Sequence, residues 1–173
     1  MKETGVVRRL DELGRVVIPK EIRKRLKINN GDMVDIYTSD DHIILEKYHP
    51  LNQDIIPIKA MLEALAQEYS FHLILFDDTR VIYSTLKEIA SEEPVCGEFI
   101  QKIPAYLDKE LSSKMNLELT DSYKFDKDIY IQRIIVNYES YGYIMVVDDI
   151  IGKKHKEALA IIDYYFQHIL EEN

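Results

Sequence analysis

The first 49 residues form a unit that is too small to bury a core by itself, and this limits what the chain can fold into. The unit reads as four short strands, the last two at Asp32–Thr38 and His42–Lys47, and one short helix. It has no cysteine for a disulfide and no spacing of metal ligands. Since chains of about fifty residues bury little apolar surface alone, we expect an obligate dimer through this unit, with intertwined hairpins.

The unit begins with a strand, a turn, a second strand and a helix. The strands are expected at Val6–Arg9 and Arg15–Ile18, on either side of a turn at Asp11–Gly14. The second strand runs into Pro19, and proline suits the first turn of a helix because of its fixed φ and missing N–H. The helix is therefore predicted over Pro19–Lys27.

Basic side chains gather in this segment. On a helical wheel, Ile22 and Leu26 face a core, and the opposite side is entirely basic. That basic side consists of Lys20, Arg23, Lys24 and Lys27. Residues 1–28 contain nine Lys or Arg and four Asp or Glu, a charge of +5, whereas the whole chain has −9. A dimer places two such sets together, and we interpret them as a surface for nucleic-acid phosphates rather than as a solvated helix face.

The sequence of the unit resembles the DNA-binding domain of AbrB-type transition-state regulators. The similarity runs from Met1 to about Tyr48 and is carried by residues 4–23, TGVVRRLDELGRVVIPKEIR. It implies a swapped-hairpin β-barrel dimer that binds double-stranded DNA sequence-specifically and regulates sporulation or transition-state genes. By position, it also implies a set of DNA-contacting residues. These are Arg8, Arg9, Arg15, Arg23 and Lys24.

Lys24 departs from the pattern of the family. Relatives often carry a second arginine beside Arg23, where this chain has Lys24. Lysine is a point charge and lacks the planar fork with which arginine recognises a base edge. We therefore expect Lys24 to contact a phosphate.

The composition indicates a folded, cytoplasmic protein. Of the 173 residues, 46% are hydrophobic, and no apolar run reaches the roughly twenty residues of a membrane span. Neither a signal peptide nor a membrane partner is expected. The single Cys96 fits a reducing cytosol and excludes an internal disulfide. The five histidines are scattered, so we expect no structural zinc and no other cofactor.

Two prolines mark a boundary between two domains. Pro50 and Pro57 enclose a polar stretch, and we place a linker at 50–57, between domains at 1–49 and 58–173. Ten basic and nine acidic side chains in the first 49 residues leave a charge of −10 for the remainder. The two domains are therefore expected to face different partners.

The second domain is predicted to be an antiparallel sheet with helices on one side, which makes the whole chain α+β. The expected elements are helices at 58–69, 98–106 and 153–170, with a disturbance at Pro104, and hairpins at 71–84 and 129–147, the latter turning at 138–142. Residues 111–127 show no regular pattern. The order of elements resembles a GAF domain, which implies a small-molecule effector of unknown identity. The pocket candidates are Tyr83, Cys96, Phe99 and Tyr130, although packing is the commoner role for each.

The last helix carries more aromatic residues than one core face needs. Its apolar face is predicted to contain Ala158, Leu159, Ile162, Tyr165, Phe166 and Ile169. Tyr164 lies outside this face, so the dimers are expected to pair into a homotetramer through these helices.

An antitoxin-like interaction module is the alternative to a DNA-binding regulator, because related swapped-hairpin folds neutralise toxins. Such proteins usually carry an extended acidic tail, whereas the acidic part of this chain has periodic apolar residues. An enzyme is not expected, since no nucleophile–base or acid pair can be assigned to a site.

Two further site types are weighed against simpler roles. The pairs Asp77–Asp78 and Asp148–Asp149 each follow a strand and could together bind a divalent cation, but aspartate also favours turns, and we expect turns. Cys96 could sense redox state, but this needs a neighbour that lowers the thiol pKa, and Lys102 is expected to be distant.

Overall fold

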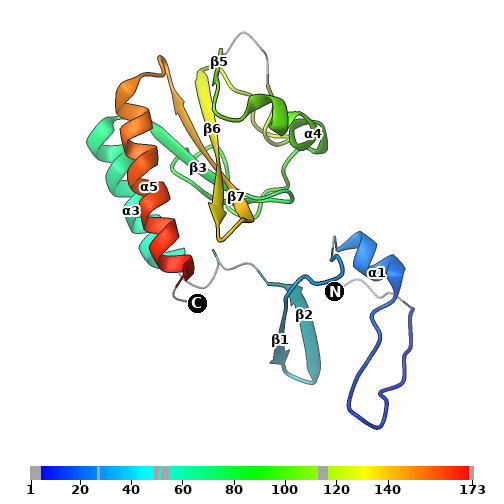
Figure 1. Ribbon diagram of the computed structural model, residues 1–173. Coiled ribbons are helices and arrows are strands. Elements are labelled where there is room, and N and C mark those ends of the chain that lie inside the picture. Colours follow the sequence, from blue (N-terminus) through cyan, green and yellow to red (C-terminus); the bar gives the residue numbers. More distant parts are fainter. Residues whose placement is uncertain (1–4, 27, 49–50, 52–54, 113–116, 172–173) are drawn as a thin grey trace. The chain divides into compact units, whose positions relative to one another are not determined.

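The computed structural model in Figure 1 describes residues 5–26, 28–48, 51, 55–112 and 117–171. The chain divides into two compact units, Met1–Tyr48 and His49–Asn173. Each unit combines helix with an antiparallel sheet, so the α+β class is confirmed. None of the helices in the described ranges is long and apolar enough to cross a membrane.

The first unit contains one helix and one strand pair. The helix α1 spans Lys20–Arg25, and the antiparallel strands are β1 (Val34–Ser39) and β2 (His42–Lys47). The predicted helix and second strand pair are therefore confirmed, and the helix starts directly after Pro19. Lys27, at the end of the predicted helix, lies outside the described residues.

The two strands predicted beside the turn are wrong for the single chain. Among the described residues, 5–10 and 15–19 belong to no strand, although Asp11 N–H donates to the carbonyl of Arg15 at 3.0 Å. The physical reason is exposure, since Val7 is 86% and Val17 is 75% exposed. An isolated two-stranded hairpin with no second layer over its apolar side chains is marginal in water.

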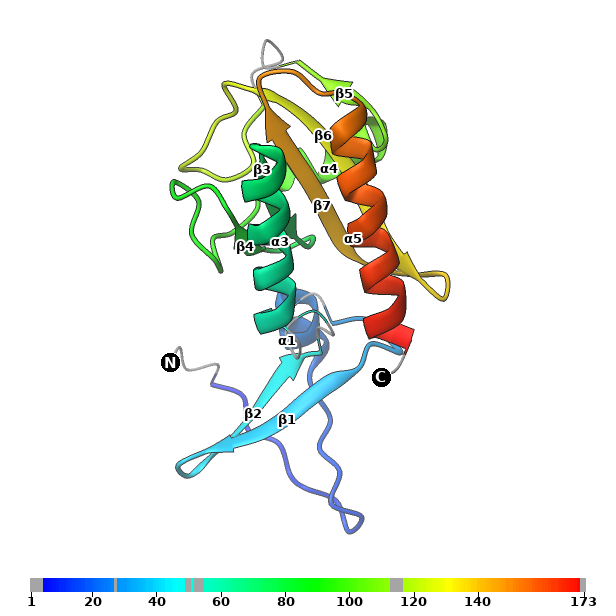
Figure 2. The same cartoon turned by 90° about the vertical axis from the view of Figure 1, so that its left-hand side faces the viewer.

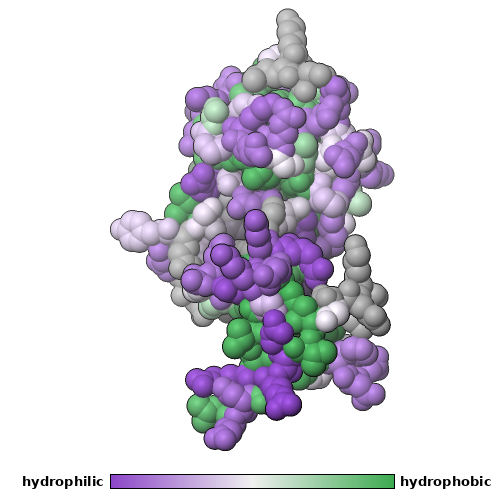
Figure 3. All heavy atoms as spheres, turned by 90° about the vertical axis from the view of Figure 1, so that its right-hand side faces the viewer, coloured by the Kyte–Doolittle hydropathy of each residue, from purple (hydrophilic) through white to green (hydrophobic). Residues whose placement is uncertain are grey.

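The first unit leaves most of its apolar side chains in solvent. Ile28 is the single buried hydrophobic residue in the part of this unit that the structure describes. Ile22, predicted to face a core, is half-buried, and Leu26 is 45% exposed. Figure 3 shows an apolar area of this unit bordered by hydrophilic side chains. The unit therefore lacks a filled core of its own, as its small size predicts.

The second unit is a five-stranded antiparallel sheet between two layers of helices. The strand order is β4–β3–β7–β6–β5. The strands are β3 (His72–Phe76), β4 (Val81–Ser84), β5 (Glu110–Leu111), β6 (Asp128–Val136) and β7 (Glu139–Asp148). The helices are α3 (Ile55–Tyr69), α4 (Gly97–Tyr106) and α5 (Lys153–Glu171). Figure 2 shows α3 and α5 side by side on one face, and α4 lies on the other face.

Helices therefore cover both faces of the sheet, and the prediction of helices on one side is wrong. The reason lies in β3, whose side chains alternate between two cores. Leu73 and Leu75 pack in the core beneath α3 and α5, whereas Ile74 and Phe76 pack in the core beneath α4. A strand buried on both faces reads as a continuous apolar run, and LILF is such a run.

The β6–β7 hairpin is confirmed, but its turn is tighter than predicted. It consists of Asn137 and Tyr138, whose φ values of 49° and 67° suit a two-residue hairpin turn. The remainder of the expected loop belongs to β7. In that strand Gly142 has φ +144°, and a Cβ there would lie 2.7 Å from the carbonyl oxygen of Phe76. Glycine is therefore required where β7 passes β3.

The three predicted helices of this unit are confirmed with shifted ends. The helix α3 begins inside the predicted linker at 50–57, and Leu51 is buried in the same core as Ile58, so the linker is shorter than predicted. The helix α4 continues through Pro104. On α5 the buried hydrophobic residues are Ala158, Leu159, Ile162 and Phe166, with Tyr165 partly buried. The side chain of Ile169 lies outside the described part of the chain.

Candidate nucleic-acid interface

The turn at residues 11–14 is closed by the side chain of its first residue. Oδ1 of Asp11 accepts the N–H of Leu13 at 3.0 Å and that of Arg15 at 2.8 Å. The Asp11 carbonyl accepts the N–H of Gly14 at 3.0 Å, and Gly14 has φ +76°, a conformation that glycine adopts readily. The sequence DELG therefore reverses the chain by local hydrogen bonds alone.

The same aspartate fixes the side chain of Arg15. Oδ2 of Asp11 accepts a hydrogen bond from Nε of Arg15 at 2.8 Å. The hydrogen bond from the Arg15 N–H, followed by that from its guanidinium, holds the pKa of Asp11 below its usual value. The Arg15 side chain is nevertheless 71% exposed. Its guanidinium is therefore held in place and accessible from solvent at the same time.

The helix α1 carries Arg23 and Lys24 in different surroundings. Nη1 of Arg23 donates to Oδ1 of Asn30 at 2.7 Å, and Arg23 is half-buried. Lys24 is exposed, as are Lys20 and Arg25. The helix therefore presents exposed basic side chains to solvent together with one arginine bound to the turn that follows the helix.

Arg8 and Arg9 precede the turn, and both are exposed. Nη1 of Arg8 donates to the carbonyl of Val7 at 2.9 Å. The five predicted DNA-contacting residues thus lie in one unit at three places, which are before the turn, after the turn and on α1. Two of them, Arg15 and Arg23, are each bound by a side-chain acceptor from a neighbouring turn.

Neither acceptor, Asp11 or Asn30, was predicted from the sequence to hold an arginine. The role of Asp11 could have been predicted, because it is an aspartate at the first position of a turn and Arg15 follows it by four residues. Asn30 follows Arg23 by seven residues and lies beyond the helix, a separation that no local pattern marks.

The four pocket candidates of the second unit do not come together. Tyr83 and Tyr130 pack with the core beneath α3 and α5, whereas Cys96 and Phe99 pack with the core beneath α4. The hydroxyl of Tyr83 donates to Glu63 on α3, and burial followed by this bond raises the pKa of Tyr83 to about 12. The sheet therefore separates the candidates into two pairs.

A hollow of about 180 Å³ lies beside α4. It is lined by Cys96, Glu98, Phe99, Lys102, Leu117 and Glu118. Lys102 and Cys96 both line this hollow, and Lys102 forms an ion pair with Glu98, one helical turn earlier. The hollow is smaller than the roughly 300 Å³ at which small-molecule sites begin.

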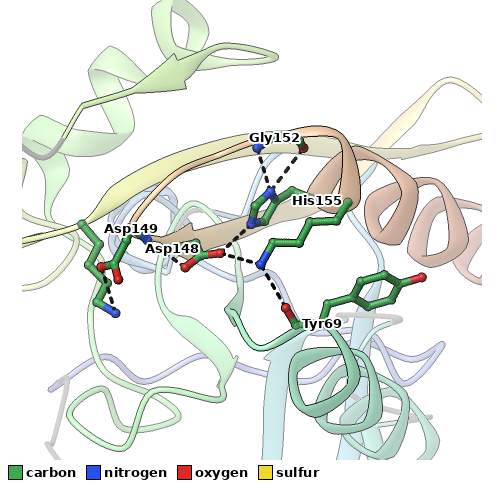
Figure 4. Close-up of polar contacts among 7 residues, drawn as sticks. Tyr69, Asp148, Asp149, Gly152 and His155 are labelled. Carbon is green, nitrogen blue, oxygen red and sulfur yellow. Dashed lines mark hydrogen bonds and ion pairs between the residues drawn. The ribbon is translucent and has the colours of Figure 1, made fainter.

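A polar cluster around the buried His155 joins the end of β7 to α3 and α5 (Figure 4). His155 is 1% exposed, and its Nδ1 accepts the N–H of Gly152 at 2.8 Å, so we assign the ring proton to Nε2, which donates to Oδ2 of Asp148 at 2.8 Å. Nζ of Lys154 lies 3.0 Å from the same Oδ2 and donates to the Tyr69 carbonyl at 3.0 Å. Burial raises the pKa of Asp148, but hydrogen bonds from His155 and Lys154 outweigh burial and hold this pKa below its usual value.

The aspartates weighed as metal ligands have other roles. Oδ1 of Asp77 accepts the N–H groups of Thr79 and Arg80 at 2.6 and 3.0 Å, which confirms the expected turn. Asp149 lies 3.3 Å from Nζ of Lys127. Among the residues that the structure describes, no group of three or more His, Cys, Asp or Glu side chains could hold a metal ion.

Known proteins resemble this chain in two ways. The family described as "Antidote-toxin recognition MazE, bacterial antitoxin" matches residues 7–52. Over 167 residues, which cover 92% of this chain and 93% of the relative, the sequence is 28% identical to stage V sporulation protein T of Bacillus subtilis (strain 168). A segment of 50 residues is 58% identical to the transition state regulatory protein AbrB of the same organism. This segment covers 29% of this chain and 52% of that relative.

Two solved structures match the same N-terminal segment at 58% identity. One is the solution structure of the N-domain of the transcription factor abrB, and the other is a refined solution structure of the N-terminal DNA recognition domain of Bacillus subtilis AbrB. They cover 29% of this chain and 96% and 94% of their own chains, with TM-scores of 0.28 and 0.25. The N-terminal part of this chain is similar to the MazE/AbrB type of domain, within a chain that is similar over nearly its whole length to stage V sporulation protein T.

Proposed function

We propose that the chain is a sequence-specific DNA-binding transcription regulator and that its first unit binds the DNA. The observation that carries the proposal is the set of basic side chains about the Asp11 turn and α1, in a segment 58% identical to AbrB. The matching domain of AbrB is described as a DNA recognition domain. The DNA-contacting residues of the proposal are Arg8, Arg9, Arg15, Arg23 and Lys24. Arginine forks suit base edges, and the lysine suits a phosphate.

In this proposal, the protein binds DNA as a dimer with swapped hairpins. The first unit exposes apolar side chains such as Val7, Val17 and Ile43, which need a partner surface. The segments 5–10 and 15–19 are strand-like in sequence but belong to no strand of the described single chain. A second copy would supply both the missing strand partners and a second set of basic residues.

The second unit is assigned the oligomerising and sensing role in this proposal. The proposed division places a DNA-binding domain at 1–49 and a GAF-like domain after it. That second domain begins earlier than the predicted residue 58, because α3 starts at Ile55 and Leu51 is buried in its core. On α5, Ile161 and Tyr164 are 46% and 66% exposed, which supports the pairing of dimers into tetramers through this helix. Light scattering at micromolar concentration should give the tetramer mass, and a dimer mass alone would contradict this part. By similarity, the regulated genes are those of sporulation or the transition state.

The proposed function is tested with the purified full-length chain and a library of random DNA duplexes. Repeated selection is expected to enrich duplexes that share a motif with two-fold symmetry, because a dimer presents two equal surfaces. The logarithm of the binding constant should fall by about 0.9 per phosphate contact for each tenfold rise in salt. Enrichment of no motif, together with the absence of salt-dependent binding, would contradict DNA recognition.

The match to the MazE family favours a second candidate, a toxin-binding module. In that case the acidic second part would wrap around a protein partner. This part instead has two packed cores around a sheet, which favours the regulator. A stable complex with a toxin from the same cell, combined with failure of the DNA selection, would instead favour the toxin-binding module.

A further inference from the structure

Asp11 and Arg15 are joined by more hydrogen bonds than a turn requires. The Asp11 N–H donates to the Arg15 carbonyl at 3.0 Å, and the Arg15 N–H donates to Oδ1 of Asp11 at 2.8 Å. These two bonds, with the one from Leu13 to Oδ1, close the turn. The third bond between the pair, from Nε of Arg15 to Oδ2 at 2.8 Å, adds nothing to the backbone and acts on the guanidinium alone.

The contact to Nε has a definite consequence for the orientation of the guanidinium. A bidentate contact with guanine or a phosphate uses two N–H groups on one edge of the arginine fork. Because Asp11 bonds Nε, the edge formed by the two terminal nitrogens of Arg15 is directed away from the carboxylate. The Arg15 side chain is 71% exposed, so this edge is accessible to a DNA groove.

The charge of Asp11 makes its position unusual. It lies within residues 1–28, whose net charge is +5, and its carboxylate repels phosphates. The carboxylate therefore lowers the attraction for any DNA while it immobilises one base-reading side chain. An arginine held in one orientation loses less conformational entropy on binding and has fewer geometries in which to meet an incorrect base pair.

We propose that Asp11 is a positioning residue for Arg15, through which the protein gains discrimination between DNA sequences at the expense of general affinity. This inference rests on the proposed function, since it concerns the same DNA-binding surface. Asp11 contacts no base itself. It determines whether Arg15 reads a base edge or pairs with the nearest phosphate.

The substitution Asp11→Asn separates this role from the turn. The amide oxygen can replace Oδ1 and keep the bonds from the N–H groups of Leu13 and Arg15, whereas the amide nitrogen replaces Oδ2 and cannot accept from Nε. Glu12→Gln is the matched control, because it removes the same charge from the adjacent turn position. Circular dichroism and elution volume check that each full-length variant keeps the parent fold and assembly.

The readout is the ratio of dissociation constants for two duplexes, measured by fluorescence anisotropy. One duplex is the sequence that the parent enriches from a random library, and the other has the same composition with a scrambled motif. Asp11→Asn is expected to lower the ratio about tenfold, an effect of about 1.4 kcal/mol, and to tighten binding of the scrambled duplex. Glu12→Gln is expected to tighten binding of both duplexes and to leave the ratio within about twofold.

A double-mutant cycle with Arg15→Ala completes the test. In the Arg15→Ala background, Asp11→Asn should no longer change the ratio, because the side chain that Asp11 positions is absent. The inference is overturned if Asp11→Asn leaves the ratio of dissociation constants unchanged, or if it lowers the ratio equally with and without Arg15. DNA binding by the parent would stand in either case. If the parent enriches no duplex at all, the proposed function fails and the inference fails with it.

Discussion

Nε2 of His155 donates a hydrogen bond to Oδ2 of Asp148 across 2.8 Å, and the two side chains are only 1% and 16% exposed. His155→Ala is expected to destabilise the second unit by about 3 kcal/mol, because it removes a buried donor to Asp148 and opens a cavity against Phe71. Urea unfolding followed by circular dichroism measures the change. Lys153→Ala, at a side chain that is 91% exposed, should stay within about 0.5 kcal/mol of the parent. Equal effects of the two substitutions would contradict a structural role for the pair.

Acid should weaken this cluster in a predictable direction. The pKa of Asp148 is lower in the folded chain than the usual carboxyl value, so its contribution is complete above that usual value, roughly pH 4, and is lost as the pH falls through the lowered folded pKa. Asp148→Asn should therefore reduce the dependence of unfolding free energy on pH below about pH 4. Urea titrations between pH 2 and pH 7, on the order of one per pH unit, provide the comparison. If the unfolding free energy depended on pH equally in parent and variant, the acid sensitivity would belong to other carboxyl groups.

Gly142 is expected to be the least replaceable glycine of the second unit. Gly142→Ala places a Cβ 2.7 Å from the carbonyl oxygen of Phe76 at φ +144°, so a loss of more than about 2 kcal/mol is expected. Gly97→Ala is the control, since a Cβ there meets nothing within 4 Å and alanine favours helix. Thermal unfolding should show a clear fall in Tm for the first variant and none for the second.

The exposed apolar residues of the first unit give a direct test of the dimer. Val17→Asp is expected to convert the assembly toward smaller species and to lower the helix and strand signal of the first unit, because a buried interface does not accept an unpaired carboxylate. Val17 is 75% exposed in the single chain, so no intrachain contact accounts for such a loss. Ile150→Asp, at a site 77% exposed in the second unit, is the matched control. Light scattering that gives equal masses for parent and Val17→Asp would remove residue 17 from the interface.

Lys24 and Arg15 should differ in what their removal does to DNA binding. Lys24→Ala is expected to weaken binding of selected and scrambled duplexes by the same factor and to reduce the salt slope by about 0.9 for each lost contact. Arg15→Ala should weaken binding of the selected duplex by an additional free energy on the order of 1–3 kcal/mol, because a base contact is lost as well. Sequence-dependent loss in Lys24→Ala would instead assign a base contact to the lysine.

Local patterns predicted most of the second unit. The apolar residues of β6 and β7, on either side of a turn, and the helical spacing in α3 and α5 located these elements to within a few residues. The layer arrangement was not predicted, because the run LILF shows that β3 is buried but not that its two faces meet different helices. The two-residue turn at Asn137 was also missed, since a tyrosine follows instead of the glycine that usually marks such a turn.

The first unit shows the limit of reasoning from one chain. The strands predicted beside the Asp11 turn depend on pairing that the single chain does not supply, whereas the turn itself depends on bonds within five residues and forms. Charge and spacing indicated the basic side of the helix, whereas the five DNA-contacting residues were implied by the resemblance to AbrB-type regulators. The acceptor Asn30 was not recognisable, because it reaches Arg23 only after the chain has left the helix.

The contact of Lys154 with the last residue of α3 has a mechanical consequence. Through Asp148 and the Tyr69 carbonyl, it fastens the end of α3 to the start of α5 beside the end of β7. Sliding of α3 along α5 would break the bond to the Tyr69 carbonyl, so this contact holds the two helices in register on the sheet.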